Sequence, residues 1–302
     1  MRRAVIYAGI FIAAVISVFG GCSRKDEKTE KIEEKVEVEE APSVSYGVFL
    51  GVDRDSFQIS DFKNYDTVVV DALELRKEQL AQLHSSGHTV YSYLNVGSVE
   101  DSREYYERFT DLLLDRYKNW PEEDWVDVTD DRWKSFVTGD LPDMIRDNDP
   151  VIDGFFIDNM DIYGHIMDSR KYREKGEETF KALVSVLESF HEAGIPVIVN
   201  GADEFVERLI EDGDAQLLLG VNQETVFTRI KSYKFDRFTR QEEKERERLT
   251  SYLKKCKDAG MEVFLLEYTK DKSLAEEIRE YCSKNQYRYY ISEHVNLVGT
   301  EE

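Results

Sequence analysis

The sequence predicts one (β/α)8 barrel from residue 46 to the end of the chain, with one possible extra strand at its C-terminal end. Two observations predict this fold. Short apolar runs rich in Val, Ile, Leu and Phe alternate with longer amphipathic stretches, which is the pattern of buried parallel strands joined by helices. This part of the chain also has about 255 residues, close to the usual length of such a barrel.

The first 45 residues differ from this pattern. Residues 1–3 are basic at two of three positions, residues 4–19 are an apolar run, and two glycines precede Cys22. We interpret residues 1–22 as a lipoprotein signal peptide with a lipidated Cys22, which predicts an extracytoplasmic protein anchored to a membrane of the cell envelope. An uncleaved anchor helix is the alternative. Residues 23–45 are highly charged and lack aromatics, so we expect a disordered tether.

Eight apolar runs are expected to be the barrel strands. They are residues 46–50, 67–71, 89–95, 125–128, 154–158, 196–200, 218–224 and 262–267. A further run at 287–292 is expected either to close or cover the barrel as an extra strand, or to replace one of the eight. An open doubly wound sheet is the second choice, because the sequence has no glycine loop of the nucleotide-binding type.

Three of the stretches between these runs have helical spacing and end at a glycine. They are residues 73–86 before Gly87, 172–193 before Gly194 and 241–259 before Gly260. A glycine after a helix supplies the left-handed cap that turns the chain back into the sheet. The repeated order of helix, glycine and strand therefore favours βα units that follow one another around a closed barrel.

Charge and composition exclude several classes of function. The formal net charge of −22 argues against nucleic acid as a partner, and fits either a cationic partner or simple solubility. The five histidines are scattered and no CxxC or HExxH motif occurs, so we expect neither a metal site nor a cofactor. Cys256 and Cys282 are expected to be buried free thiols, with a disulfide as the alternative.

Polar residues stand at the ends of the predicted strands, where the active sites of barrels lie. They are Asp71, Asn95, Asp158, Asn159, Asn200, Asn222, Gln223, Glu224, Glu267 and Tyr268. Helix capping explains one such residue better than it explains four carboxylates together. Paired carboxylates without metal ligands and without a nucleophilic Ser or Cys fit glycoside hydrolysis.

Aromatic residues are expected near the same mouth, where some can stack on sugar rings and others belong to the core. They are Tyr91, Tyr93, Trp125, Trp133, Tyr163 and Tyr268.

Five motifs occur in a fixed order along the chain. They are YLNVGSVEDSREYY at 93–106, WVDVTDDRW at 125–133, GFFIDNMDIY at 154–163, GVNQETVF at 220–227 and LLEYT at 265–269. Together they resemble the endo-α-1,4-polygalactosaminidase family of glycoside hydrolases over roughly residues 46–297. The resemblance implies a TIM-barrel enzyme that cuts α-1,4-linked galactosamine polymers, which are cationic when deacetylated and would suit an acidic chain.

The resemblance also implies that Asp158 and Glu224 are the key acids, and the family commonly has Asp-Tyr where this chain has Glu267-Tyr268. We therefore expect a retaining endo-glycosidase with Asp158 as nucleophile and Glu224 as general acid and base, the reverse assignment remaining open. Asp71 and Glu267 are expected to bind the substrate amine or tune the pair.

The remaining expected substrate contacts come from hydrogen-bonding and aromatic side chains. They are Tyr93, Asn95, Asn159, Asn200 and Tyr268. Two other hypotheses are a non-catalytic carbohydrate-binding lipoprotein on the same barrel and an envelope scaffold without a sugar ligand. The first would require the loss of a carboxylate, and neither has been lost.

Overall fold

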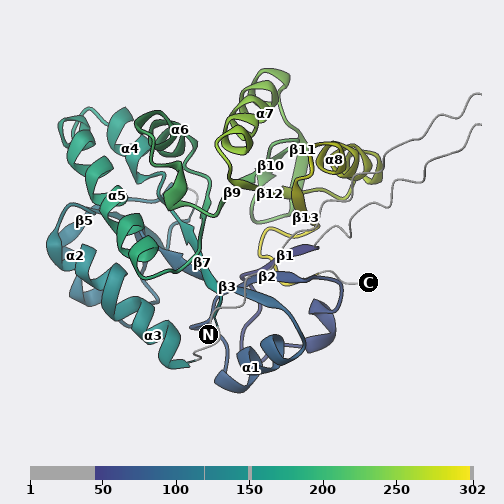
Figure 1. The fold of residues 1–302 in the computed structure, drawn as a ribbon, viewed down its shortest axis with the longest axis horizontal. Coiled ribbons are helices and arrows are strands. Elements are labelled where there is room, and N and C mark those ends of the chain that lie inside the picture. The colour runs from purple at the N-terminus through teal and green to yellow at the C-terminus, as the bar shows by residue number, and fades with distance from the viewer. Residues whose placement is uncertain (1–44, 119, 149–151, 300–302) are drawn as a thin grey trace, which may run out of the picture. The chain divides into compact units, whose positions relative to one another are not determined.

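A computed structural model describes residues 45–118, 120–148 and 152–299. The chain divides into two units, Met1–Ala41 and Pro42–Glu302, and every described residue belongs to the second. In this unit eight parallel strands form one sheet in the order β1-β2-β3-β7-β8-β9-β12-β13 (Figure 1). The predicted (β/α)8 barrel is confirmed.

The barrel strands are short and almost entirely buried. They are β1 (Tyr46–Phe49), β2 (Thr67–Val70), β3 (Thr89–Asn95), β7 (Gly154–Asp158), β8 (Val197–Asn200), β9 (Gly220–Glu224), β12 (Glu262–Tyr268) and β13 (Arg288–Ser292). Just beyond β1 and β13, the Gly51 N–H donates to the Leu297 carbonyl at 3.2 Å. The sheet is therefore a nearly closed barrel.

Helices cover the outside of the barrel. They are α1 (Lys77–Ser85), α4 (Ile162–Asp168), α5 (Gly176–Glu192), α6 (Asp203–Asp212), α7 (Glu243–Asp258) and α8 (Lys272–Asn285). The three helices predicted from sequence are α1, α5 and α7. The glycine after α7, Gly260, has a φ of 91°, the left-handed conformation that the cap requires.

The predicted strand at residues 125–128 is not part of the barrel. Trp125 lies instead in β6 (Glu123–Val126), which pairs antiparallel with β4 (Ser98–Glu100) and β5 (Leu113–Arg116) in a separate three-stranded sheet. This sheet belongs to an insertion between β3 and β7 that also contains α2 (Asp131–Ser135), a π-helical turn (Phe136–Asp140) and α3 (Leu141–Asn148). A four-residue apolar run predicts a strand but not its sheet.

The place in the barrel is taken by β13, which pairs in parallel with β12. Of the two outcomes expected for the run at 287–292, replacement of one of the eight strands is therefore the observed one. The helix before it, α8, ends at Asn285 and is capped by Gln286, which has a φ of 57°. Because glutamine here takes the left-handed position that glycine occupies after α1, α5 and α7, this unit lacks the glycine signal of the others.

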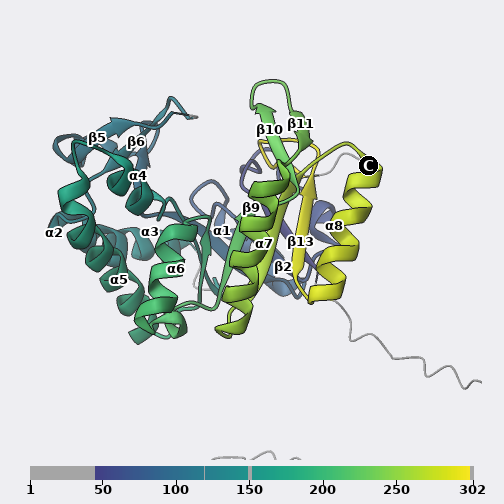
Figure 2. The ribbon, with the colours of Figure 1, turned by 90° about the horizontal axis from the view of Figure 1, so that it is seen from above.

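A second insertion follows β9 and forms the hairpin β10 (Thr228–Ser232) and β11 (Arg237–Arg240). Both insertions leave the barrel at the carboxyl ends of their strands, after Asn95 in β3 and after Glu224 in β9. Figure 2 shows β5, β6 and this hairpin projecting at the same end of the barrel. The catalytic face predicted from sequence is therefore flanked by two inserted β-structures.

Side chains inside the barrel form a core that is distinct from the larger core between strands and helices. The interior residues are Tyr46, Val48, Val69, Tyr91, Phe156, Ile198, Phe264, Leu266, Tyr268, Tyr290 and Leu297.

Among the described residues, no helix combines the length and the apolar character needed to span a bilayer.

Candidate active site

Asp158 and Glu224 meet at the carboxyl ends of β7 and β9, and an amide from the strand between them joins the two. Asn200 Nδ2 donates to Asp158 Oδ1 at 3.0 Å and to Glu224 Oε1 at 2.8 Å. Because one nitrogen bonds both carboxylates, these two oxygens lie less than about 6 Å apart.

Strand alternation explains why these three side chains converge. Phe156 and Ile198 belong to the core inside the barrel, and successive side chains of a strand point to opposite faces. Asp158 and Asn200, two residues further along the same strands, therefore also point inward. Glu224 points the same way, because it lies two residues after Asn222 on β9 and the Asn222 amide bonds the inward-facing Asn200. The pair predicted from sequence is thus brought together by the barrel itself.

The amide of Asn200 is held in place by two further residues. Asn222 Nδ2 donates to Asn200 Oδ1 at 2.6 Å, and the Tyr46 hydroxyl donates to Asn222 Oδ1 at 3.2 Å. Both residues are buried. Because Asn200 Oδ1 accepts the hydrogen bond from Asn222, the amide nitrogen of Asn200 faces the two carboxylates.

The surroundings of Asp158 and Glu224 raise the pKa of both carboxyl groups. Burial raises the pKa of Asp158 well above its usual range, and repulsion from Glu224 adds to the effect. Burial also raises the pKa of Glu224, against hydrogen bonds from Asn200 and from the Tyr268 hydroxyl, the latter at 2.9 Å from Oε2. Two carboxylates this close favour a state that holds one proton between them.

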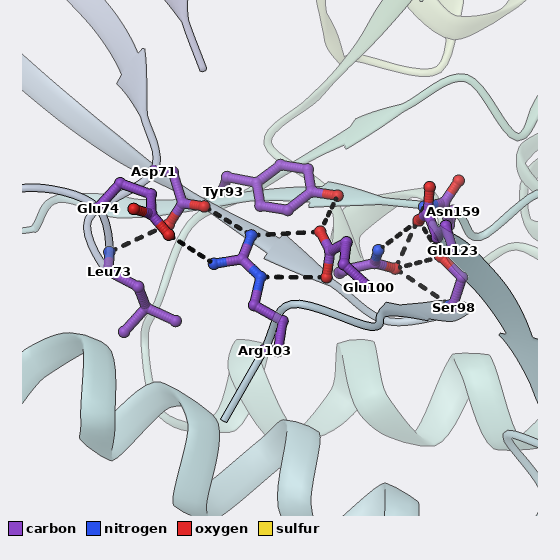
Figure 3. Close-up of polar contacts among 10 residues, drawn as sticks. Asp71, Leu73, Glu74, Tyr93, Ser98, Glu100, Arg103, Glu123 and Asn159 are labelled. Atoms are coloured by element: carbon purple, nitrogen blue, oxygen red, sulfur yellow. Dashed lines mark hydrogen bonds and ion pairs between the residues drawn. The ribbon is translucent and has the colours of Figure 1, made fainter. Parts of the chain in front are cut away.

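Asp71 and Tyr93 line the same cavity, and both contact a salt-bridge cluster centred on Arg103 (Figure 3). The Arg103 guanidinium lies 2.7 Å from Asp71 Oδ2, 3.2 Å from Glu100 and 3.6 Å from Glu74. The Tyr93 hydroxyl donates to Glu100 Oε1 at 3.3 Å. Because the Leu73 N–H also donates to Asp71 Oδ1 at 3.0 Å, both Asp71 oxygens already have partners.

Glu123 from β6 also lines the cavity, and Figure 3 shows it at the opposite side of the view from Asp71. Its Oε1 accepts from Asn95 Nδ2 and Asn159 Nδ2, each at 2.8 Å, and from the Ser98 hydroxyl. Burial raises the pKa of this carboxyl. Asn159 follows Asp158 directly and has a φ of 63°, a left-handed conformation that asparagine adopts more readily than most residues.

Glu267, which was expected to bind the substrate amine or to tune the pair, is not among the residues that line the cavity. Leu266 and Tyr268 line the cavity, so alternation turns Glu267 to the opposite face of β12. There Glu267 is fully buried and its carboxylate accepts from the Phe227 N–H at 2.9 Å and the Thr228 N–H at 3.0 Å. It positions the start of the β10–β11 hairpin and does not reach a substrate in the cavity.

The cavity has a volume of about 710 Å³. Its lining includes the expected residues Asp71, Tyr93, Asp158, Asn159, Asn200, Glu224 and Tyr268. Asn95 is not among the lining residues, because its amide is used by Glu123 and Ser98. Its amide nitrogen donates to Glu123 Oε1 at 2.8 Å, and its expected contact with sugar hydroxyls stays a prediction.

Aromatic residues from the two insertions also line the cavity. Tyr117 and Trp120 come from the β5–β6 side and Tyr233 from the tip of the β10–β11 hairpin. The rings of Trp120 and Tyr233 meet edge to face with centroids 5.3 Å apart. Of the aromatics expected at the mouth, only Tyr93 and Tyr268 line this cavity.

The other expected aromatics are packed elsewhere. Tyr91 lies in the interior core and Tyr163 in the core outside the strands. Trp133 is buried and donates to the Val96 carbonyl at 2.8 Å, and Trp125 stacks on Tyr117 with centroids 4.5 Å apart. None of these four residues is among those that line the cavity.

Sequence reasoning missed the residues that the first insertion contributes, notably Glu100, Arg103, Tyr117, Trp120 and Glu123. None of them ends a barrel strand, which was the signal used to find the others. Two signs were available in the sequence: residues 100–125 are rich in acidic and aromatic side chains, and Glu100 and Arg103 lie within the motif at 93–106.

Cys256 and Cys282 are both buried free thiols, as expected. Burial raises the pKa of Cys256 to about 12, so its thiol stays protonated and unreactive at neutral pH. Residues 1–44, which include Cys22, the expected signal peptide and the expected tether up to residue 44, lie outside the described residues.

Comparison with known proteins gives one family and several similar folds. The model of glycoside-hydrolase family GH114 matches residues 41–297. No curated protein matches the chain.

Two solved structures are similar over most of their own length. The glycoside hydrolase domain of PelA from Pseudomonas aeruginosa has a TM-score of 0.68 and 18% identity, covering 85% of this chain and 97% of that one. Ega3 from Aspergillus fumigatus, solved in complex with galactosamine, has a TM-score of 0.66 and 16% identity, covering 86% and 94%. At these identities the similarity establishes the fold.

A more distant barrel is also similar. The noncanonic maltogenic alpha-amylase AmyB from Thermotoga neapolitana has a TM-score of 0.50 and 8% identity, covering 83% of this chain and 67% of that one.

Proposed function

The chain belongs to glycoside-hydrolase family GH114, and from this premise we propose that it is an endo-acting retaining hydrolase of α-1,4-linked galactosamine polysaccharides. The observation that carries the proposal is the Asn200 amide shared by Asp158 and Glu224. It holds the two carboxyl groups at a spacing that suits retention, for which about 5–5.5 Å is typical, better than inversion, for which about 6.5–9.5 Å leaves room for a water.

Asp158 is the better nucleophile of the two. Both of its hydrogen bonds, from Asn200 Nδ2 and from the Asn159 N–H at 3.0 Å, go to Oδ1. Oδ2 has no hydrogen-bond partner among the described residues, and is therefore free to attack the anomeric carbon. Glu224 has both oxygens engaged, by Asn200 and Tyr268, which suits a group that keeps its place while it gives and takes a proton.

The reaction then has two steps. In the first, Asp158 Oδ2 bonds to C1 of the sugar, the glycosidic C1–O bond breaks, and Glu224 gives its proton to the leaving oxygen. In the second, the Glu224 carboxylate takes a proton from water, the water oxygen bonds to C1, and the ester bond to Asp158 breaks. The proton that the pair holds at the start is restored at the end.

The charge of the cavity supports a cationic substrate. Seven carboxylates line it, together with a single positively charged side chain, Arg103. A cavity of one sign raises the local concentration of a ligand of opposite sign. Deacetylated galactosamine polymers carry one ammonium per sugar. Ega3, which is similar in fold, was solved with galactosamine, and this supports the same substrate class.

The proposal is tested with Asp158→Asn and Glu224→Gln. Each variant should lose at least about 10³-fold in the release of reducing ends from α-1,4-galactosamine polymer, while thermal unfolding monitors the fold. The α-anomer should be the first product seen by NMR. Full activity of either variant, or a β-anomer as first product, would show that the pair or the retaining mechanism is wrong.

We also propose that the mature protein is a lipoprotein on the outer side of a membrane. This rests on the sequence of residues 1–22 alone, where an apolar run and two glycines precede Cys22. A tether of residues 23–45 would then let the enzyme reach a polysaccharide outside the cell.

A further inference from the structure

The function proposed above calls for a group that binds the ammonium on C2 of galactosamine, and a carboxylate with a free oxygen is the strongest such partner. Asp71 and Glu267 were the expected candidates, but the carboxylate oxygens of both already have partners within the protein. Asp71 is ion-paired with Arg103 at 2.7 Å, and Glu267 faces away from the cavity with its oxygens bonded to residues 227 and 228. Another carboxylate must therefore serve.

Glu123 is a buried carboxylate that lines the cavity and keeps one oxygen free. Its residue exposure is only 7%. Oε1 accepts from Asn95, Asn159 and Ser98, whereas Oε2 has no hydrogen bond to any residue that the structure describes. A buried carboxylate is costly unless its charge is compensated, and in this cavity a bound cation would compensate it.

The position of Glu123 relative to the nucleophile fits the chemistry of the sugar. Asn159 joins the two, because its side chain donates to Glu123 Oε1 at 2.8 Å while its backbone N–H donates to Asp158 Oδ1 at 3.0 Å. In a 2-amino sugar, C2 is bonded directly to C1, the atom that Asp158 attacks. The carboxylate that binds the C2 ammonium must therefore lie beside Asp158, on the same side of the cavity.

Other lining carboxylates fit this role less well. Glu100 is ion-paired with Arg103 at 3.2 Å. Asp161 is fixed by the Ala202 N–H at 3.0 Å and is the main competitor, because it also lines the cavity and its Oδ2 has no hydrogen bond to any described residue. Glu123 differs in having three donors on one oxygen, which aim the other oxygen in a fixed direction.

We propose that Glu123 is the specificity-determining residue that binds the C2 ammonium of the sugar attacked by Asp158, and so selects galactosamine over N-acetylgalactosamine units. The proposal rests on the function proposed above. An N-acetyl group has no charge and places a bulky neutral amide where the free Oε2 lies.

The test is the preference of Glu123→Gln for deacetylated over fully N-acetylated α-1,4-galactosamine polymer. Glutamine keeps an oxygen for the three donors but replaces Oε2 with an NH2 group that repels an ammonium. The ratio of kcat/KM for the two polymers should fall by about thirtyfold or more, mainly through KM on the deacetylated polymer. Glu123→Asp keeps the charge and should retain more of the preference than Glu123→Gln.

The matched control is Asp124→Asn. Asp124 is the next residue on β6 and is equally buried, but it bonds the Tyr106 hydroxyl at 2.8 Å and Arg116 at 3.2 Å on the other face of the strand. Its substitution should leave the preference unchanged. Thermal unfolding of all variants separates a loss of preference from a loss of fold.

The outcomes distinguish the two proposals. If the unaltered enzyme cleaves galactosamine polymer and Glu123→Gln keeps its preference, the role of Glu123 is disproved and the proposed function stands. The role is equally disproved if Asp161→Asn abolishes the preference while Glu123→Gln does not, or if Glu123→Asp loses as much as Glu123→Gln. If the unaltered enzyme cleaves neither polymer, both proposals fail.

Discussion

The Asn200 side chain controls both members of the carboxylate pair through one nitrogen. Its two amide hydrogens each serve one carboxylate, and its oxygen is occupied by Asn222. An amide cannot change its proton count with pH, so it keeps the spacing of the pair constant while the pair itself exchanges one proton. An aspartate at position 200 would add a third negative charge and remove both donors.

The hydroxyl of Tyr268 should tune the acid. Its hydrogen bond to Glu224 Oε2 at 2.9 Å stabilises the carboxylate and so lowers the pKa of Glu224 against the effect of burial. Tyr268→Phe removes this bond, so the pKa of Glu224 should rise and the alkaline limb of the kcat/KM profile should move to higher pH. The rate at the optimum should fall by about tenfold, because the carboxylate formed in the first step loses a hydrogen bond.

The control for this variant is Tyr290→Phe. Tyr290 also lies in the core inside the barrel, and its hydroxyl is buried without a hydrogen-bond partner in the described part of the chain. Its pH profile should match that of the unaltered enzyme. A Tyr268→Phe profile that also matches would mean that the hydroxyl does not act on the group that limits the alkaline rate.

Residues of the candidate site could be predicted from sequence where an apolar run forms a barrel strand and a polar residue ends that same run. Asp158, Asn200 and Glu224 each end an apolar run that is itself a barrel strand, so their convergence follows from the fold. Arg103 and Glu123 sit in an insertion whose path across the barrel mouth depends on long-range pairing. No local pattern in the sequence carries that information.

Helices and strands were predictable where the local signals agree. The runs at 67–71 and 154–158 are continuous and apolar, and the structure has strands there. The run at 125–128 is interrupted by Asp127 but still favours a strand, and it pairs with β4 and β5 rather than with the barrel. Strand propensity is local, but the choice of partner strand is set by the whole fold.

The two inserted β-structures meet above the catalytic pair through Trp120 and Tyr233. Trp120 is 43% exposed and Tyr233 38% exposed, which is unusual for rings that also line a cavity. Exposed aromatic faces beside a sugar-binding cavity offer stacking surfaces for sugar units away from the cleaved bond. Contacts of this kind add binding energy only for chains long enough to reach them.

We therefore expect Trp120→Ala to lower kcat/KM about fivefold on long polymer, with a smaller loss on a trimer or tetramer. Initial rates over a series of galactosamine oligomers of increasing length measure this difference. Phe235→Ala is the matched control, because Phe235 is 62% exposed on the same hairpin as Tyr233 but does not line the cavity. An equal loss of activity at every chain length would argue against stacking.

Negative charge is spread over the surface of the domain and is also concentrated in the cavity. The chain has 62 acidic and 40 basic residues, and most ion pairs lie on the surface, where each contributes little to stability. The carboxylates of the cavity differ from these because burial raises the pKa values of Asp71, Glu123, Asp158 and Glu224. The domain thus maintains an acidic site at a cost in stability, as active sites commonly do.

Burial of a carboxyl group elsewhere in the domain should have the same kind of cost, measurable as a loss of stability with rising pH, and Glu267 is the clearest case because it lies outside the cavity. Burial raises its pKa from 4.5 to about 7. The folded state then binds this proton more tightly than the unfolded state, so the free energy of unfolding falls as pH rises from about 4.5 to about 7.

Urea unfolding at pH 5 and pH 7.5 measures the difference in the free energy of unfolding between the two pH values. Glu267→Gln should reduce this difference by about 2 kcal/mol, whatever its effect on absolute stability. Glu280→Gln, which removes an exposed carboxyl on α8, should leave the difference unchanged. If Glu267→Gln also leaves it unchanged, Glu267 is ionised at both pH values and its three hydrogen bonds to residues 227 and 228 outweigh its burial.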